Sequence, residues 1–451
     1  MEIQEWRFRR QLVLVPLPLQ GHLNPMLQLG AILHSKGFSI TIAHTHFNSP
    51  NPSDHPNFIF LPLSVGFSSF TPFRDDFIAF LSILNTNFET PLRELLTQMI
   101  QKQGQDDKLP CIIYDGLMYC VAEITQSLKL PGIVLRTSCA ANLLAYYAFP
   151  GLRNEGYLPV QDSSLLNIVP GFHPLRFKDL PAHSFSLDVM LQLMATLRDT
   201  GSSSAIIWNT MDFLEESSLE QIQKQFQIPV FPIGPMHKIV TAASTSLQEE
   251  ETSCVKWLDR QSQNTVIYIS LGSVVIIDAE ELGEISWGLA KSNQPFLWVV
   301  RPGSIQGSNW IELLPEGFRE AIGERGCIIK WAPQKEVLAH AAVGGFWSHC
   351  GWNSTLESIS EGVPMICRPC FGDQRVVARY VIHVWRVGLA LENKLEKGEI
   401  ERTIRSLMVD REGEEMRQRA MDLKEMAQLS INKGGSCYNS LNELVEFIAS
   451  S

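Results

Sequence analysis

The feature that most constrains the fold of this 451-residue chain is an alternation of short apolar runs with longer helix-like segments. Near the N-terminus, "QLVLVPL" is followed by the periodic segment "NPMLQLGAILHSKG" and then by "FSITIAH". Asn24 suits an N-cap, Pro25 suits the first helical position, and Gly37 is a stop signal. "CIIYD", "GIVLRT" and "AIIWNT" continue the series. This alternation predicts a parallel sheet with helices on both faces.

The second half of the chain repeats the pattern. "TVIYISLG" precedes a helix capped by Asp278, and "PFLWVV", "CIIKW", "GGFWSH", "PMICRP" and "VGLAL" follow as predicted strands. The chain is too long for one ordinary core. We therefore expect an α/β protein with two doubly wound, Rossmann-like domains that face each other across a cleft.

A polar stretch without periodicity separates the two halves. Residues 236–253, "MHKIVTAASTSLQEEETS", indicate a linker. The predicted N-terminal domain covers residues 1–235, and the predicted C-terminal domain covers residues 254–432. The amphipathic segment within residues 433–451 is expected to form a last helix that packs back on the N-terminal domain.

Charge and cysteine content narrow the classes of function. A net charge of -11 argues against a nucleic-acid partner, which requires a basic surface. An anionic small molecule remains possible, because backbone N–H groups can bind phosphate with little net charge. The nine cysteines are scattered through a chain that needs no disulfide framework. Reduced thiols and a cytoplasmic location are therefore expected.

No membrane segment is predicted. The N-terminal run "QLVLVPLPL" imitates a signal peptide, but it contains Pro16 and Pro18 and is better explained as a first buried strand. No apolar run approaches the ~18 residues that a transmembrane helix needs. We also expect a monomer.

In open parallel sheets, ligands bind at the carboxyl ends of the strands. The strand "GGFWSH" ends at His349, and the next helix is expected to begin near Asn353 or Ser354. Gly351 allows the backbone to approach a ligand closely. These side chains and the N–H groups of the first helical turn form an anion site suited to a diphosphate. Alternatively, Ser354 to Glu357 fits a capping box, in which Glu357 only caps the helix.

The neighbouring strand ends favour the ligand site. After "CIIK", Trp331 can stack on a nucleobase, and Gln334 can bond to polar groups of the base. After the following strand, Asp373 and Gln374 offer a carboxylate and an amide, which pair with vicinal sugar hydroxyls. Groups for a base, a diphosphate and a sugar thus lie at three successive strand ends.

Residues 331–374 resemble the signature box of plant UDP-sugar-dependent glycosyltransferases of small molecules, which have the two-domain GT-B fold. "WAPQ", "HCGWNS", "EGVP" and "DQ" occur in the expected order and spacing. The resemblance extends from "QGHLNP" to the C-terminal helix. "FSITIAHTHFNSPNPSDHPNF" and "FLWVVRPGS" are similar to the subfamily that includes enzymes acting on cytokinins and steviol glycosides.

The resemblance implies a hexosyltransferase whose donor substrate is UDP-glucose. The nucleoside is contacted by Trp331, Ala332 and Gln334, and the ribose hydroxyls by Glu357. The diphosphate is held by Ser273, His349, Gly351, Asn353 and Ser354, and the sugar by Trp352, Asp373, Gln374 and Thr137. One departure bears on the preferred sugar, because Val377 stands where relatives usually carry asparagine.

The chemistry is expected from two residues of the N-terminal half. His22 lies at the first strand-to-helix turn, and Asp115 ends the strand "CIIYD". A phenolic acceptor has a pKa of ~10 and is a poor nucleophile. A neutral imidazole can take its proton as the oxygen attacks the anomeric carbon, with Asp115 fixing the tautomer. UDP then leaves from the opposite face and the configuration inverts. Alternatively, His22 is a solvated loop residue and Asp115 a turn cap.

No metal or other cofactor is expected. The sequence lacks the D-x-D pair that metal-dependent transferases use, so the helix terminus replaces the cation. Cys367 and Cys370 have metal-binding spacing without a second pair, and we interpret them as two thiols. The G-x-G-x-x-G motif of nicotinamide enzymes is also missing. A non-catalytic nucleotide-binding module remains the main rival, against which His22 and Asp115 argue.

The acceptor is predicted to be a small hydrophobic plant metabolite, such as a flavonoid, a phenolic or a terpenoid. Four segments of the N-terminal half, residues 67–80, 117–119, 139–147 and 184–193, are rich in aromatic and apolar side chains. The aromatic candidates are Phe70, Phe73, Phe77, Tyr119, Tyr146 and Phe185. The same residues could be ordinary loop packing. Transfer to a nitrogen, a carboxyl or the sugar of an existing glycoside, or from another UDP-sugar, is the alternative.

Overall fold

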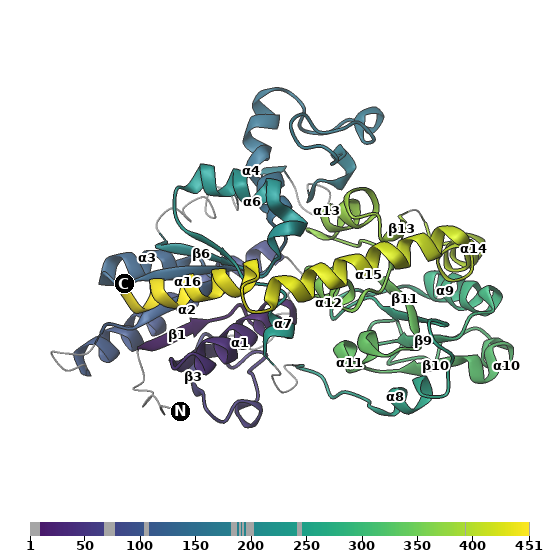
Figure 1. Cartoon of the computed structure of the whole chain (residues 1–451), viewed down its shortest axis with the longest axis horizontal. Coiled ribbons are helices and arrows are strands. Elements are labelled where there is room, and N and C mark those ends of the chain that lie inside the picture. Colours follow the sequence, from purple (N-terminus) through teal and green to yellow (C-terminus); the bar gives the residue numbers. More distant parts are fainter. Residues whose placement is uncertain are drawn as a thin grey trace. The chain divides into compact units, whose positions relative to one another are not determined.

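The computed structural model describes residues 10–66, 77–102, 108–181, 187–188, 191, 194, 203–240, 246–392 and 394–450 (Figure 1). The chain forms two compact units, which are described separately. The first unit comprises the described residues of Met1–Pro159, Phe185–Leu247 and Leu429–Ser451. The second comprises those of Val160–Ser184 and Gln248–Gln428. The segment Val160–Ser184 thus belongs to the second unit, although it lies inside the range of the predicted N-terminal domain.

Among its described residues, the first unit contains a seven-stranded parallel sheet in the order β3-β2-β1-β4-β5-β6-β7. Its strands are β1 (Gln11–Val15), β2 (Ser39–Thr45), β3 (Ile59–Leu63), β4 (Cys111–Asp115), β5 (Gly132–Arg136), β6 (Ala205–Trp208) and β7 (Val230–Pro232). The five strands predicted from apolar runs are confirmed. The unpredicted strands, β3 and β7, are the two edges, where Pro62 and Pro232 are tolerated because one side of each strand needs no ladder donor.

Helices pack against this sheet. They are α1 (Gln20–Ser35), α2 (Phe77–Lys102), α3 (Cys120–Leu128), α4 (Ala140–Asn154), α6 (Asp212–Phe226), α7 (Met236–Ile239) and α16 (Ser436–Ser450). The C-terminal helix α16 buries Leu444 and Ile448 in the same core as β1 and α1. Met236, at the start of the predicted linker, is also buried in this core, because α7 presents an apolar side chain to it.

Helix α1 begins earlier than we predicted. Its N-cap is Leu19, whose carbonyl accepts from the backbone N–H groups of His22 and Leu23 at 2.9 and 2.8 Å. Asn24 is therefore inside the helix, where its side chain accepts a hydrogen bond from Gln20 at 2.9 Å instead of capping. The end of the helix matches the prediction, since Gly37 has a φ of 90° just beyond it. His22 consequently lies in the first turn of α1.

The second unit contains, among its described residues, a six-stranded parallel sheet in the order β10-β9-β8-β11-β12-β13. The strands are β8 (Val266–Ser270), β9 (Phe296–Val299), β10 (Gly326–Ile329), β11 (Val343–Ser348), β12 (Met365–Cys367) and β13 (Gly388–Ala390). Its helices are α8 (Ser253–Leu258), α9 (Ala279–Ser292), α10 (Phe318–Ile322), α11 (Gln334–Ala339), α12 (Trp352–Glu361), α13 (Gln374–Arg379), α14 (Lys397–Met408) and α15 (Arg411–Ile431), the last of which continues into the first unit. The six predicted strands are confirmed, and Asp278 caps α9 as predicted, by accepting from the Glu281 N–H at 2.8 Å.

Each sheet reverses its strand order at one point. In the first sheet β1 lies between β2 and β4, and in the second β8 lies between β9 and β11. The connections leaving two adjacent strands run in opposite directions there, which opens a crevice at their carboxyl ends. His22 follows β1 and Asp115 ends β4, whereas Ser273 follows β8 and His349 follows β11. These four predicted site residues therefore lie at the positions where this class of sheet binds ligands.

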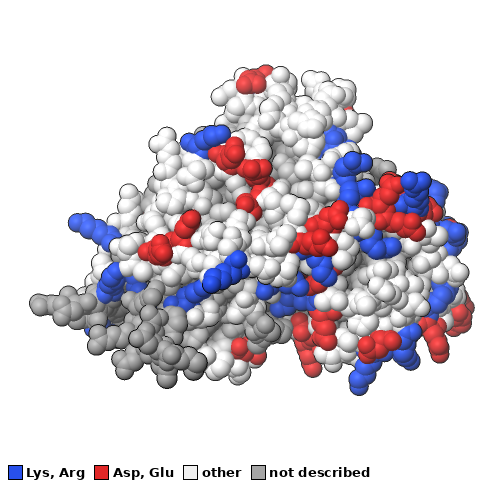
Figure 2. Space-filling model, in the orientation of Figure 1, with Lys and Arg blue, Asp and Glu red and all other residues white. Residues whose placement is uncertain are grey.

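The described surface carries both signs of charge. On the face drawn in Figure 2, acidic and basic side chains lie interspersed, most densely over the part of the chain that contains α14 and α15. This distribution differs from the continuous basic face of a nucleic-acid-binding protein. Among the described residues, no helix combines the length and the apolar composition that a membrane span requires.

Candidate active site

In the first unit, three predicted residues meet at the carboxyl edge of the sheet. Nδ1 of His22 lies 2.8 Å from Oδ2 of Asp115 and 3.0 Å from Oγ1 of Thr137. Asp115 is buried, with 1% of its side chain exposed, whereas 24% of the His22 side chain is exposed. The second oxygen of Asp115 accepts from the Leu117 N–H at 2.9 Å. Both carboxylate oxygens are thus engaged, and the carboxylate is fixed in position.

This arrangement determines which ring nitrogen of His22 is basic. A carboxylate against Nδ1 favours the tautomer with its proton on Nδ1, so Nε2 becomes the nitrogen that can accept a proton. The alternative in which Asp115 only caps a turn is incomplete, because one of its oxygens caps the turn and the other holds His22. The sequence did not indicate the contact of Thr137 with His22, since that contact depends on the adjacency of α1 and β5.

The turn after β4 has a further neighbour that the sequence did not indicate. Arg136, the last residue of β5, is buried beneath Gly116, and a Cβ at Gly116 would come within 2.5 Å of its guanidinium. Burial lowers the pKa of Arg136, while Tyr147, Tyr114 and Asp115 oppose this shift. A glycine after Asp115 therefore has a steric cause, namely the space that Arg136 occupies.

In the second unit, the ring of His349 lies close to two glycines. A Cβ at Gly272 would lie 2.7 Å from its ring, and a Cβ at Gly351 would lie 2.5 Å from its Nε2. We predicted that Gly351 lets a ligand approach the backbone. The structure gives a more direct reason for a glycine, since a side chain at this position would collide with the imidazole of His349. Burial lowers the pKa of His349 to about 4, although a backbone contact with Ser270 opposes the shift. The ring is consequently neutral at physiological pH.

Helix α12 contradicts the capping-box alternative. The helix begins at Trp352 with Gly351 as its N-cap, so Glu357 is too far along the helix to cap it. Instead, Oε2 of Glu357 accepts from Nε2 of Gln334 at 2.7 Å, and the same nitrogen donates to Oγ of Ser354 at 2.9 Å. Burial raises the pKa of Glu357, and the bond from Gln334 opposes this effect. Three residues that were assigned to the nucleoside, the ribose and the diphosphate are thereby brought together.

The strand end that carries Trp331, the residue predicted to stack on the base, is supported by hydrogen bonds that the sequence did not predict. The carbonyl of Trp331 accepts from the backbone N–H of Glu251 at 2.9 Å, and the Glu251 side chain accepts from the Lys330 N–H at 2.9 Å. These bonds fix the strand end that carries Trp331 and the buried Ala332. The amide oxygen of Gln334 accepts from Tyr268, whose hydroxyl lies 3.1 Å away. Hydrogen bonds to both the oxygen and the nitrogen therefore fix the orientation of the Gln334 amide.

The loop assigned to the sugar is held by one of its own members. The amide oxygen of Gln374 accepts from the backbone N–H groups of Cys370 and Phe371 at 2.8 and 3.1 Å, so only its amide nitrogen can serve a ligand. Asp373 is the N-cap residue of α13. Val377 is fully buried in the same helix, which gives a packing reason for an apolar side chain at that position.

The remaining donor-site candidates lie around the same strand ends. Ser273 follows Gly272 in the loop after β8, and Asn353 lies in the first turn of α12. Trp352 is 3% exposed, and its ring centroid lies 6.2 Å from that of Trp385. Its buried indole thus lies near Trp385, which follows α13 in the chain.

The acceptor region is described only in part. Phe70, Phe73 and Phe185 lie outside the described residues, as do most of residues 184–193. Of the described candidates, residues 140–145 are buried on α4 and belong to the packing of the first unit, whereas Tyr146 and Tyr119 are partly exposed. Burial raises the pKa of Tyr119. The ordinary-packing alternative therefore holds for part of this region.

The cysteines were predicted to be reduced thiols, and no metal site was predicted. All nine cysteines are thiols, and Cys367 is fully buried at the end of β12. The described residues contain no group of three or more His, Cys, Asp or Glu side chains arranged to hold a metal ion.

Comparison with known proteins assigns the chain to a family. The model of the family described as "UDP-glucoronosyl and UDP-glucosyl transferase" matches residues 84–428. The chain belongs to this family. It is therefore a UDP-glycosyltransferase, as the signature box from Trp331 to Gln374 indicated.

Relatives cover nearly the full length of the enzyme. UDP-glycosyltransferase 76H1 of Stevia rebaudiana is 50% identical, with 94% of this chain and all of that protein aligned. Flavonol 3-O-glucosyltransferase UGT76E12 of Arabidopsis thaliana is 48% identical over 99% of this chain and 98% of its own length. UDP-glycosyltransferase 76E1 of Solanum lycopersicum is 48% identical over 98% of this chain and 93% of its own length.

Solved structures share the fold. UGT2 of Phytolacca americana, complexed with UDP-2-fluoro-glucose and pterostilbene, aligns with a TM-score of 0.85 and 28% identity over 98% of this chain and all of that structure. Os79 of O. sativa in complex with UDP aligns with a TM-score of 0.83 and 27% identity over 97% of this chain and all of that structure. The prediction of a GT-B transferase is confirmed.

Proposed function

We propose that this UDP-glycosyltransferase transfers glucose from UDP-glucose, with inversion, to a hydroxyl of a small hydrophobic plant metabolite. The observation that carries the proposal is the 2.8 Å contact between His22 and the buried Asp115, at the switch point of the first sheet. A binding module that only retains nucleotide has no use for such a pair. The relatives named for glucosyl transfer support the same reaction.

In this mechanism, His22 is the general base. Nε2 takes the acceptor proton while the acceptor oxygen forms its bond to the anomeric carbon, and the bond from that carbon to the UDP oxygen breaks on the opposite face. The imidazolium that forms is stabilised by Asp115 through Nδ1–H. Thr137 adds a second polar contact at Nδ1 and limits rotation of the ring.

The donor is assigned to the second unit, with Thr137 contributing to the sugar from the first. We assign the base to Trp331, Ala332 and Gln334, the ribose to Glu357, the diphosphate to Ser273, His349, Gly351, Asn353 and Ser354, and the sugar to Trp352, Asp373, Gln374 and Thr137. Because its imidazole is held neutral, His349 can donate one hydrogen bond to a phosphate oxygen without adding a charge. The N–H groups of the first turn of α12 supply the remaining donors.

The acceptor is assigned to a flat or hydrophobic class. One relative is named for a flavonol, and one structural neighbour holds pterostilbene. Partly exposed aromatic side chains such as Tyr119 and Tyr146 suit an aglycone of this kind. The alternative is transfer to a nitrogen, a carboxyl or the sugar of a glycoside. We further propose a monomer in the cytoplasm, which is in accord with nine cysteines that are all thiols.

The first experiment measures UDP release from UDP-glucose with flavonoid, phenolic and terpenoid acceptors and identifies the products by mass. We expect one acceptor class to gain a single hexosyl unit. UDP release without a glycosylated product would indicate hydrolysis, and UDP binding without any turnover across the panel would contradict the proposed acceptor class.

Chelation tests the role of the helix terminus. Because α12 and its donors are assigned to the diphosphate, we expect the rate to be unchanged by EDTA. The measurement is the initial rate before and after dialysis against the chelator. A strong loss that manganese restores would contradict a metal-independent mechanism.

A further inference from the structure

A loop from the middle of the chain belongs to the donor unit. Residues 165–180, here called the strap, fold back on themselves through backbone bonds from Phe177 to Asn167 at 3.0 Å and from Val169 to Leu175 at 2.8 Å. Val169, Leu175 and Phe177 are buried. The strap is therefore an ordered element whose apolar side chains are buried.

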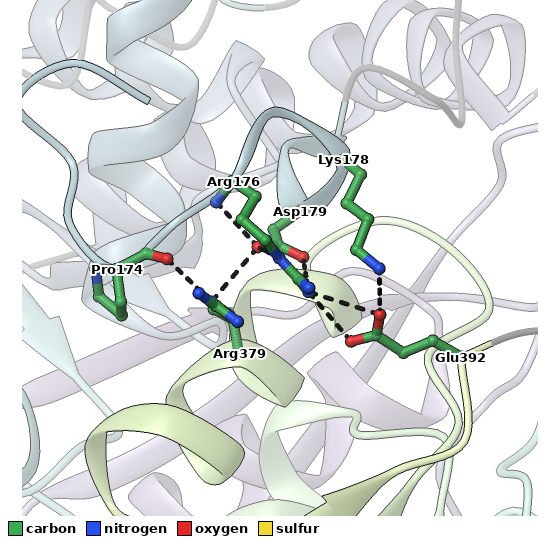
Figure 3. A network of polar contacts seen from close by, with 6 residues as sticks. All are labelled: Pro174, Arg176, Lys178, Asp179, Arg379 and Glu392. Atoms are coloured by element: carbon green, nitrogen blue, oxygen red, sulfur yellow. Dashed lines mark hydrogen bonds and ion pairs between the residues drawn. The ribbon is translucent and has the colours of Figure 1, made fainter. Parts of the chain in front are cut away.

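The strap presents charged side chains to helix α13, as Figure 3 shows. Arg176 grips Asp179 with Nε and Nη2 at 2.8 and 2.7 Å. On the other side of Asp179, Nε of Arg379 lies 3.6 Å away, and it donates to the carbonyl of Pro174 at 2.8 Å. Asp179 is thus a carboxylate between two guanidinium groups, with 4% of its side chain exposed.

A second anchor joins the strap to the segment after β13. Glu392 accepts from Nη2 of Arg176 at 3.1 Å and is also bonded to Lys178 (Figure 3). Burial acts to raise the pKa of Glu392, but the bonds from Lys178 and Arg176 outweigh burial and lower it. Glu392 is therefore an anion at physiological pH, and the strap is held at two places.

Helix α13, whose last residue Arg379 is bonded to the strap, carries the residues assigned to the sugar at its other end. Arg379 is the last residue of α13, Gln374 is the first, and Asp373 is the N-cap. A helix of six residues spans only about 9 Å. The residues from Val376 to Arg379 are buried, so packing holds the helix in place, and the bond of Arg379 to Pro174 joins its end to the strap. The amide of Gln374 in turn fixes the loop from Cys370.

We propose that Asp179 and Arg379 are positioning residues for the donor sugar. By holding the last turn of α13, the strap fixes the orientation of Asp373 and Gln374 at its first turn. Without the carboxylate of Asp179, two mostly buried guanidinium groups would face each other and repel, which would displace the helix. This inference rests on the proposed assignment of Asp373 and Gln374 to the sugar.

The test compares two ligands of the full-length enzyme, UDP and the non-transferable UDP-2-fluoroglucose. For Asp179→Asn, which keeps the shape and removes the charge, we expect the Kd of UDP-2-fluoroglucose to rise about threefold to tenfold, the factor of one hydrogen bond. The Kd of UDP should stay within about twofold, because the contacts assigned to UDP lie on other loops. Arg379→Lys, which retains the charge, should keep most of the affinity for UDP-2-fluoroglucose.

Two further variants separate the possible failures. Asp373→Ala should weaken UDP-2-fluoroglucose directly, and if it does not, the assignment of the sugar site is wrong. Lys424→Gln breaks another ion pair of a mostly buried carboxylate, that of Glu361, and should leave both Kd values unchanged. The positioning role is overturned if Asp179→Asn raises the Kd of both ligands equally. It is also overturned if Asp179→Asn changes neither Kd while Asp373→Ala raises that of UDP-2-fluoroglucose. If Asp179→Asn does not fold, Glu392→Gln replaces it under the same criteria.

Discussion

Replacing His22 by alanine is expected to lower kcat by about 10²–10⁴-fold with a phenolic acceptor. The reason is that the acceptor proton loses its only assigned base at the moment when the oxygen attacks. UDP binding should be unchanged, because every residue assigned to the nucleotide lies in the second unit. The measurement is steady-state turnover together with the Kd of UDP. Near-normal turnover would refute the base assignment.

Asp115→Asn is the matched variant for this prediction. An asparagine amide can turn its NH₂ group toward Nδ1 of His22, which would move the ring proton to Nε2 and remove the base. The side chain is buried and keeps its size, so a loss of kcat without a loss of stability would identify the tautomer as the cause. We expect a loss of up to about 10⁴-fold, the effect known for this exchange in a hydrolase triad.

Replacing Gly351 by alanine is expected to raise the KM for UDP-glucose by about tenfold to a hundredfold. The backbone at this position, with φ -62° and ψ 141°, permits alanine. The new Cβ would, however, lie 2.5 Å from Nε2 of His349, so the imidazole would have to shift. Overpacking of this kind typically costs about 1–3 kcal/mol, and here it displaces a side chain assigned to the diphosphate.

Gly283→Ala provides the control for this substitution. Gly283 lies in helix α9, and a Cβ at that position meets no atom within 4 Å. We expect unchanged kinetics and a gain in stability of about 0.5–1 kcal/mol, because alanine favours the helix. Equal KM values for the two variants would show that the contact of Gly351 with His349 is unimportant for the donor.

Much of the fold could be predicted because central strands of parallel sheets are continuous apolar runs. The two edge strands of the first sheet, β3 and β7, escaped prediction, since Pro62 and Pro232 interrupt their patterns and are acceptable only at an edge. The start of α1 was also misjudged. Asn24 and Pro25 are good start signals in isolation, but the carbonyl of Leu19 nucleates the first turn five residues before Asn24.

The candidate site was predictable where its residues lie at the ends of strands, as Asp115 does in β4 and His349 does after β11. Contacts between distant segments were not predictable. The side chain of Glu251 accepts from the Lys330 N–H, 79 residues away, next to Trp331, and Arg379 reaches the carbonyl of Pro174 over 205 residues. Spacing within one segment carries no information about such pairs, because they depend on which elements become neighbours in the folded chain.

The strap has a consequence for building chimeric enzymes. The chain passes between its two units near residues 159, 184, 247 and 428. A chimera that joins two parents only at the linker would therefore not exchange complete units. The second unit would then combine residues 165–180 of one parent with α13 and Glu392 of the other parent. Segment Val160–Ser184 should therefore be transplanted together with the rest of the second unit. Arg379 then keeps its own partners, Pro174 and Asp179.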